Sequence, residues 1–412
     1  MFDLIKIAVR NLLRYRRRTV LTASLVAIGV IFVLVFSAAS GSFKSLMVGQ
    51  ITDSLMGHLQ IHKKGYVSSI ENLPLNLGMP GKTFVKIDEI LKDSKDVEAS
   101  SPRIKFGALF SNFVESTNIR LNGVYPEREF KTVPLLPSRI SKGSKSIKKG
   151  EILIPALLEK GMKVKVGDSI VIVATNKDGS VNGRQFVVSG VLDGITGPGG
   201  RDGYIHIDDA VELLRLPEME ISEIVIRLND FNHLKKAQAD IASKLHATFQ
   251  KDGQFPLEIH SWEDLSPFFN IALMIDIMTF FIKIMLVALV LISVLNVMIM
   301  AVYERIREIG TMAAIGTPPG KILTLFMIEG LSLGVLGAVF GGIAGGIILF
   351  ILNIAKITYN FGQSKGLVLQ ASMNLTELAV ISVIVIIVSV LATLEPAFKA
   401  SRMKPIEALR HV

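Results

Sequence analysis

Two long apolar runs joined by a short charged segment constrain this chain more than any other feature. The first run, residues 284–302, has no charged side chain over 19 residues. A helix of that length rises about 30 Å, the thickness of the hydrocarbon core of a bilayer. The second run, residues 323–355, carries one charge, Glu329. Since backbone groups in lipid must satisfy their own hydrogen bonds, both runs are predicted to be transmembrane helices.

Charge and composition indicate which side of the membrane each part occupies. The chain is 50% hydrophobic yet 20% charged, a mixture that fits a few spanning helices and a large water-facing domain. Residues 2–18 hold six Lys or Arg and one Asp, and residues 304–321 and 395–412 also hold more basic than acidic side chains. Basic flanks of membrane spans stay in the cytoplasm, so these three segments are predicted to be cytoplasmic. No aromatic side chains interleave the basic ones as in a nucleic-acid surface, and without cysteine no disulfide can form.

We therefore predict a membrane α-helical protein with four transmembrane helices and a large α+β extracytoplasmic domain between helices 1 and 2. The predicted segments are a cytoplasmic amphipathic helix (1–18), the first span with a stalk (19–49), the extracytoplasmic domain (50–267), a stalk with the second span (268–302), a cytoplasmic coupling loop (303–321), the third span (322–355), a short external loop (356–377), the fourth span (378–394) and a cytoplasmic tail (395–412). Within the large domain, residues of about 50–100 and 221–266 are predicted to form a core, and residues 101–220 an inserted β-rich module.

Local patterns support the α+β assignment of the large domain. Alternating or apolar runs bounded by turn residues predict strands at residues 58–62, 151–155, 168–175 and 184–192. Helical spacing of apolar side chains predicts helices at residues 86–91, 206–216 and 230–249.

The N-terminal segment admits two interpretations. Residues 2–18 alternate apolar pairs with Lys6, Arg10, Arg14 and Arg17, which suits a helix lying at an anionic inner leaflet. A solvated basic flank that only sets orientation fits the same pattern equally well. The apolar stretch that follows, residues 19–39, is longer than the 7–15-residue core of a secretory signal, so an uncleaved anchor is predicted.

Motifs that could carry catalysis are incomplete. Residues 81–83 read GKT, the end of a phosphate-binding loop, but Asn76 stands where its first glycine is required. The glycines of residues 197–203 lack dinucleotide-binding spacing, and the acidic residues of 206–209 more simply begin a helix. No catalytic residue and no metal ligand is predicted, and the chain is not expected to be an enzyme.

Charges and glycines inside the apolar runs are predicted to serve structure. Glu329 is expected near the inner interface, where pairing with Arg305 or Lys321 is favoured over ion coupling. Asp276 and Lys283 are expected at the outer rim as snorkelling anchors. Small residues four apart allow helix backbones to approach closely. The glycines predicted to pack helices in this way are Gly330, Gly334, Gly337, Gly341 and Gly345.

Two stretches resemble a known family. Residues 305–337 are similar to the permease signature of the FtsX/MacB-like superfamily of ABC transporters, which works by mechanotransmission. Residues 395–412 resemble that family's C-terminal ending, and residues 58–66 and 261–269 look more like its lipoprotein-releasing branch. The resemblance implies a bacterial inner-membrane location, a second permease copy or paralogue, and a dimer of separate cytoplasmic ABC ATPase subunits. ATP and Mg would be bound by those subunits, so no cofactor is expected in this chain.

The resemblance also implies roles for individual residues. Residues 304–316 would form a coupling helix that docks on the ATPase, although the TPPGK turn at 317–321 replaces the more polar turn common in the family. The expected ATPase contacts are Glu304, Arg305, Arg307, Glu308, Ile309 and Met312. The expected contacts to acyl chains of a lipidated cargo are Leu34, Val35, Phe43, Ile275 and Phe281.

Three functions fit these features. The first is extraction of lipoproteins or other lipidated cargo from the inner membrane, with membrane lipids and a periplasmic lipoprotein carrier as partners. The second is export of amphipathic small molecules or peptides with a periplasmic adaptor. The third is a transmembrane signal relay to a cell-wall hydrolase. No nucleic-acid partner is expected for any of them.

Overall fold

The chain folds into two compact units, which we call the helical unit and the sheet domain. The computed structural model describes residues 2–193, 200–249, 256–361, 364–368 and 375–403. The helical unit comprises Met1–Ser45, Ala272–Tyr359 and Val368–Val412, and the sheet domain comprises Leu46–Ile271 and Asn360–Leu367.

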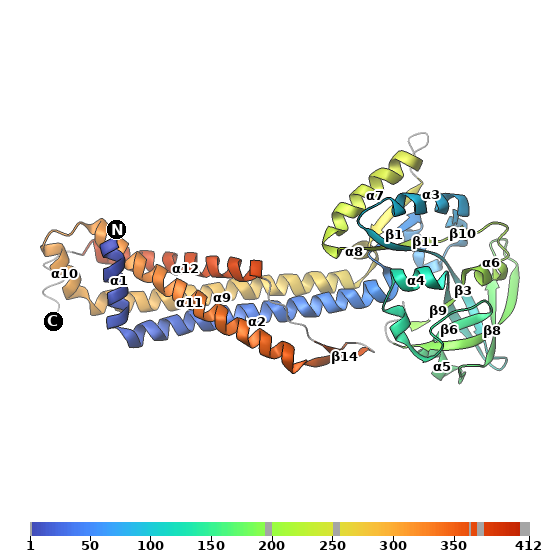
Figure 1. The fold of residues 1–412 in the computed structure, drawn as a ribbon, viewed down its shortest axis with the longest axis horizontal. Coiled ribbons are helices and arrows are strands. Elements are labelled where there is room, and N and C mark those ends of the chain that lie inside the picture. Colours follow the sequence, from blue (N-terminus) through green and yellow to red (C-terminus); the bar gives the residue numbers. More distant parts are fainter. Residues whose placement is uncertain (1, 194–199, 250–255, 362–363, 369–374, 404–412) are drawn as a thin grey trace. The chain divides into compact units, whose positions relative to one another are not determined.

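The apolar runs form long helices (Figure 1). The helices of the membrane-spanning part are α1 (Phe2–Arg14), α2 (Arg16–Ile51), α9 (Phe268–Glu304), α10 (Ile306–Ala314), α11 (Pro319–Ala355) and α12 (Leu375–Ser401). Among the described residues, α2, α9, α11 and α12 are long and apolar enough to cross a membrane. The predicted fold class, four transmembrane helices with a large α+β domain between the first two, is confirmed.

Glycine brings α11 into close contact with two neighbouring helices. Gly337, Gly341 and Gly345 face α2, where Val26, Val30 and Leu34 occupy the space that a side chain on each glycine would need. Gly330 and Gly334 face α12, opposite Thr393 and Ser389. The glycines predicted to pack helices therefore lie on two faces of α11, and each face meets a different helix.

The sheet domain is built on one ten-stranded sheet. The strand order is β12-β1-β11-β3-β4-β9-β6-β8-β5, and β7 pairs with both β3 and β8. The strands of this sheet are β1 (Leu59–Lys63), β3 (Val97–Ser111), β4 (Ser116–Val124), β5 (Ile140–Gly143), β6 (Glu151–Pro155), β7 (Ser169–Thr175), β8 (Val181–Leu192), β9 (Asp202–His206), β11 (Glu223–Leu228) and β12 (Leu257–Ser261). Two further pairs are β2 (Met79–Pro80) with β10 (Glu220–Ile221) and β13 (Thr358–Phe361) with β14 (Ser364–Val368).

Short helices accompany this sheet. They are α3 (Gly81–Lys92), α4 (Pro126–Thr132), α5 (Ala156–Gly161), α6 (Ile207–Leu213), α7 (Leu234–Phe249) and α8 (Trp262–Leu265). The predicted strands coincide with β1, β6, β7 and β8, and the predicted helices coincide with α3, α6 and α7, so these assignments are confirmed.

One strand joins the predicted core to the predicted insert. The insert has its own hydrophobic cluster, whose buried members run from Ile104 to Leu214. However, β3 crosses the predicted boundary near residue 100: its first half pairs with β11, and its second half pairs with β4 and β7. The sheet is therefore continuous across that boundary, and the division into core and insert stays a prediction.

A buried ion cluster lies on β3 and its neighbours. Arg103 is fully buried, and it donates hydrogen bonds to Glu129 (2.9 Å) and Glu223 (3.0 Å). The Nζ atom of Lys105 lies 3.3 Å from Glu223, and His62 lies 3.7 Å from it. Burial opposes ionisation of Glu223, but Lys105, His62 and Arg103 hold the pKa of its carboxyl well below the ordinary value.

Candidate functional site

The segment between α9 and α11 forms a short separate helix at one end of the helical unit. Arg305, with φ −111° and ψ 17°, ends α9 and precedes the first residue of α10. Gly316 ends α10 in a left-handed conformation (φ +93°) that side chains disfavour. Pro319 then begins α11, where its fixed φ and missing N–H suit the first turn of a helix. The TPPGK turn therefore contains the first residues of α11.

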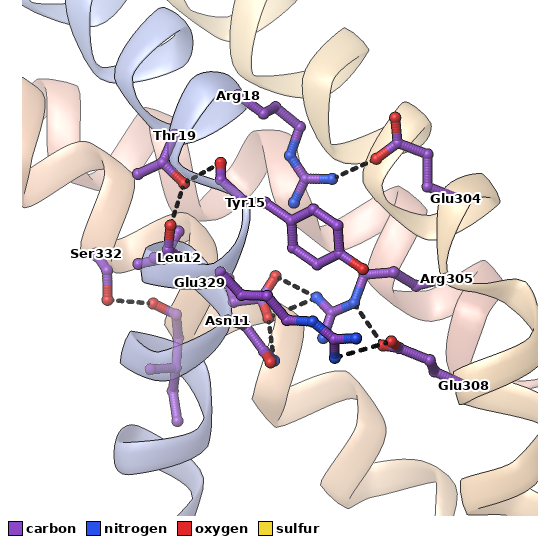
Figure 2. A network of polar contacts seen from close by, with 12 residues as sticks. Asn11, Leu12, Tyr15, Arg18, Thr19, Glu304, Arg305, Glu308, Glu329 and Ser332 are labelled. Atoms are coloured by element: carbon purple, nitrogen blue, oxygen red, sulfur yellow. Dashed lines mark hydrogen bonds and ion pairs between the residues drawn. The ribbon is translucent and has the colours of Figure 1, made fainter.

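A buried ion pair fixes this helix to α11. Figure 2 shows Arg305 and Glu329 side by side, and the Nη1 atom of Arg305 donates to both carboxylate oxygens of Glu329, at 2.8 and 3.2 Å. Both side chains are almost completely buried. Asn11 of α1 donates to the same carboxylate at 2.9 Å, and the Nε atom of Arg305 donates to Glu308 at 3.1 Å. The pairing predicted for Glu329 is confirmed, with Arg305 as the partner.

The junction between α1 and α2 adds further contacts to this network. The ring of Tyr15 lies under the guanidinium of Arg305, at 5.7 Å, and under that of Arg18, at 5.2 Å. Arg18 also pairs with Glu304 at 3.0 Å (Figure 2), and Arg14 pairs with Glu308 at 3.4 Å. The N-terminal helix is thus joined to the end of α9, to α10 and to α11. We call this set of contacts the junction network.

The outer face of α10 is exposed. Arg307, Thr311 and Ile315 follow one another at four-residue spacing, and each is solvent-exposed. Ile315 is 79% exposed, an unusual value for a large aliphatic side chain beside a buried ion network. An exposed face with an apolar side chain at one end and a cation at the other suits binding of another protein.

Comparison with known proteins identifies the family. The family described as MacB-like periplasmic core domain matches residues 19–244, and the family described as FtsX-like permease C-terminal matches residues 279–405. The chain belongs to the FtsX/MacB-like permeases of ABC transporters. The resemblance that residues 305–337 indicate is therefore confirmed.

Curated relatives of this permease include members of two groups. The lipoprotein-releasing system transmembrane protein LolC of Neisseria meningitidis is 22% identical over 413 residues, which cover 95% of this chain and 94% of that protein. LolC of Xylella fastidiosa is 24% identical and covers 71% of this chain and 72% of that protein. The macrolide export ATP-binding/permease protein MacB of Nitrobacter winogradskyi is 25% identical over 95% of this chain but 58% of that protein. The permease therefore lies near the LolC group of this family.

Solved structures also match part of the permease. The periplasmic region of MacB from Actinobacillus actinomycetemcomitans aligns with a TM-score of 0.37 and 12% identity, covering 54% of this chain and 94% of that chain.

Two of the expected ATPase contacts are buried in the structure. Arg305 is buried against Glu329, and Ile309 is 1% exposed inside the hydrophobic core of the helical unit. Neither side chain is accessible to another protein in this arrangement, and their direct contact with an ATPase stays a prediction. Met312 is half-buried against the same core, and Glu304 and Glu308 are partly exposed but pair with Arg18 and Arg14. Sequence reasoning missed Ile315, although its four-residue spacing from Thr311 and Arg307 was visible.

At the opposite end of the long helices, the charged side chains pair between helices. Lys283 of α9 lies 2.6 Å from Glu377 of α12, which also accepts a hydrogen bond from Ser37 of α2. Lys44 of α2 lies 2.5 Å from Asp276 of α9. Asp276 and Lys283 therefore each pair with a charged side chain of another helix and are not isolated snorkelling anchors. The sequence analysis missed Glu377 as the partner of Lys283.

The expected cargo contacts differ in accessibility. Leu34 is 4% exposed and packs against Gly345, so it is not accessible to cargo in this packing of α2 and α11, and its role as a cargo contact stays a prediction. Phe281 is 63% exposed, whereas Val35, Phe43 and Ile275 are half-buried. Phe281 is the expected contact with the largest accessible apolar surface.

Two of the motifs considered for catalysis or metal binding lie at the starts of helices. Within the described residues no group of three or more His, Cys, Asp or Glu side chains could hold a metal ion. Residues 81–83 form the first turn of α3, and His206 caps α6 by accepting a hydrogen bond from the Asp208 N–H, as expected of a helix start. Gly197 and Gly199, and the tail residues 404–412 that carry part of the C-terminal resemblance, lie outside the described residues.

Proposed function

We propose that this permease extracts lipoproteins or other lipidated cargo from the bacterial inner membrane, driven by a separate ATPase. The observation that carries the proposal is the similarity to LolC of Neisseria meningitidis over nearly the whole length of both chains. A second permease, identical or paralogous, would complete the membrane part. The large sheet domain would then face the periplasm and pass cargo to a soluble carrier.

The exposed face of α10 is the proposed ATPase contact. Arg307, Thr311 and Ile315 would touch a cytoplasmic dimer of ATPase subunits, which bind ATP and Mg. Behind this face, Arg305 ties α10 to Glu329 of α11, so a push on α10 is passed to a spanning helix rather than absorbed in a loose loop. Arg305 and Ile309 act in this proposal as positioning residues.

Energy input is required because acyl chains are held strongly by lipid. Each buried CH₂ group contributes about 0.8 kcal/mol, so removing a diacyl or triacyl anchor from a bilayer is unfavourable without ATP hydrolysis. The exposed apolar surface around Phe281 of α9 would replace the bilayer as the environment of those chains.

A second candidate function is export of amphipathic molecules with a periplasmic adaptor. The similarity to MacB of Nitrobacter winogradskyi, over 95% of this chain, favours it. The MacB protein is named as both ATP-binding and permease, and this chain spans 58% of it. The two candidates differ in cargo and in periplasmic partner, not in the membrane scaffold.

Photocrosslinking in native membranes tests the proposal. A photoreactive amino acid at Phe281 should capture a lipidated protein, and purification of the crosslinked permease should also recover an ABC ATPase. The matched control is Phe350 of α11, which is equally exposed (65%) on another helix and should capture only bulk phospholipid.

Two results would contradict the proposal. Capture of a soluble adaptor or an amphipathic small molecule at Phe281, without lipidated protein, would favour the exporter. Recovery of a cell-wall hydrolase with no cargo at either position would favour a signal relay.

A further inference from the structure

Helix α1 has two faces of different chemistry. One face packs on α11: Ala8 and Leu12 are buried there, and Asn11 reaches Glu329. The opposite face is exposed and carries cations between apolar side chains. Its members are Lys6, Ile7 (47% exposed), Arg10 and Leu13 (59% exposed), and Arg14 lies at its edge, where it pairs with Glu308.

The course of α1 places this exposed face at the level of lipid headgroups. Figure 1 shows α1 running across the direction of α2, so a bilayer crossed by α2 has α1 lying along its surface. After the turn at Tyr15, the exposed cation Arg17 is followed by the exposed apolar residues Val20 and Leu21. The change from cation to apolar side chain within one helical turn marks the boundary between headgroups and hydrocarbon.

We propose that the outer face of α1 binds anionic phospholipid, and that the bound lipid holds α10 in place through the junction network. Lys6, Arg10 and Arg17 would contact phosphate groups, while Ile7 and Leu13 enter the acyl region between them. A free phosphate has no apolar part that could contact Ile7 and Leu13, whereas a phospholipid has acyl chains that can. This surface therefore fits a lipid rather than a free phosphate.

Asn11 on the inner face of α1 and Arg14 at the edge of its outer face carry the effect to α10. Asn11 holds Glu329, which pairs with Arg305 at the start of α10, and Arg14 pairs with Glu308 within α10. A lipid that fixes α1 therefore reduces the freedom of α10. The effect of lipid on ATPase docking rests on the proposed function, in which α10 is the ATPase contact. Lipid binding to α1 itself needs no ATPase.

Hydrogen exchange of the purified full chain in nanodiscs tests the proposal. Phosphatidylglycerol added to phosphatidylcholine should slow amide exchange in residues 6–17 and in residues 306–314. The variant Lys6→Gln/Arg10→Gln/Arg17→Gln, whose three positions take part in no ion pair among the described residues, should lose both effects. The control Lys131→Gln/Lys235→Gln/Lys236→Gln removes the same charge from the sheet domain and should keep both.

A second variant separates binding from transmission. Asn11→Ala/Arg14→Gln should keep the lipid-dependent protection of residues 6–17 and lose that of residues 306–314. The proposal is overturned if phosphatidylglycerol protects neither segment in the natural chain, if the triple variant behaves like its control, or if inorganic phosphate protects as well as the lipid. Failure to recover an ATPase in native membranes would contradict the proposed function without changing these results.

Discussion

Arg305 and Glu329 show why a charged pair is tolerated at the edge of a membrane-spanning bundle. Each charge loses water on burial, and only close contact with an opposite charge and further hydrogen bonds offsets that loss. Glu329 finds both Arg305 and Asn11, and Arg305 also finds Glu308 and the ring of Tyr15. The pair therefore specifies how α10, α11 and α1 fit together.

Removing one partner of this pair should be more damaging than removing both. Glu329→Gln leaves the buried guanidinium of Arg305 without an opposite charge, and we expect a loss of about 3–5 kcal/mol in the free energy of unfolding. Arg305→Met/Glu329→Met should recover most of that loss, because no buried charge remains. Unfolding in mixed micelles measures both; a double variant as unstable as the single one would contradict this explanation.

Glu223 makes the stability of the sheet domain depend on pH. Its pKa is lowered in the folded chain, so its stabilising effect is complete above the ordinary value of 4.5 and is lost as the pH falls below that value. Each pH unit below it should remove about 1.4 kcal/mol through this one group. In Glu223→Gln this part of the slope should vanish.

The chain contains its own probe for that measurement. Trp262 is the single tryptophan, and it is buried in the sheet domain. Urea unfolding followed by its fluorescence at several pH values compares the two chains; identical slopes below pH 4.5 would exclude a charged Glu223 as the cause.

At the residue scale, the sequence predicted an ion pair where few opposite charges were available, but it did not predict contacts between residues far apart in the chain. The pairing of Glu329 with Arg305 was predictable, because an intramembrane carboxylate has few cations within reach. The burial of Arg305 was not, because Asn11 and Tyr15 lie almost 300 positions earlier in the chain. A charged turn between two spans ordinarily faces water, whereas α11 and the distant N-terminal helix cover this one.

At the scale of elements, the long helices were predictable because lipid leaves the backbone few alternatives to an α-helix. The break at Arg305 agrees with the separate helix over residues 304–316 that the family resemblance implies. The glycine spacing indicated close packing, but it could not say that α2 lies on one face of α11 and α12 on the other.

Gly341 should be the least replaceable of these glycines. A Cβ atom there would lie 2.7 Å from the Cβ of Val30 and 2.8 Å from the backbone oxygen of Ala27, and the latter cannot rotate away. We expect Gly341→Ala to reduce the free energy of unfolding by about 1–3 kcal/mol through overpacking. Gly320→Ala, on the same helix with no atom within 4 Å, is the control and should be neutral or mildly stabilising. Equal effects at both positions would mean that α2 and α11 do not pack this closely in the membrane.

At the scale of the whole molecule, the order of strands in the sheet was beyond prediction. β1 pairs with β11 and β12, which lie more than 150 residues later in the chain. The sequence analysis did not predict β3 as a strand, although β3 pairs with three strands, β11, β4 and β7. Alternation of apolar residues identifies a strand but not its neighbours, because any two strands with one apolar face can pair.

The proposed force pathway gives a prediction at this scale. Arg307→Ala and Ile315→Ala alter only the exposed face of α10, so the permease should insert and fold normally. With its ATPase in proteoliposomes, each should release less cargo for every ATP hydrolysed. Thr324→Ala, half-buried on α11, is the control. Unchanged cargo release per ATP in both variants would exclude this face as the point where force enters.

The paired spacing of α2 and α11 limits how these two helices can move past each other. Side chains of α2 pack on glycines of α11 in the same order along both helices: Val26 on Gly337, Val30 on Gly341 and Leu34 on Gly345. The two helices therefore run parallel, and their contacts repeat every four residues. A slide of one four-residue repeat, about 6 Å, would bring each of these α2 side chains opposite the next glycine, whereas a smaller slide would produce steric clashes. An axial movement of α11 should therefore displace it relative to α2 by whole four-residue repeats and not by smaller distances.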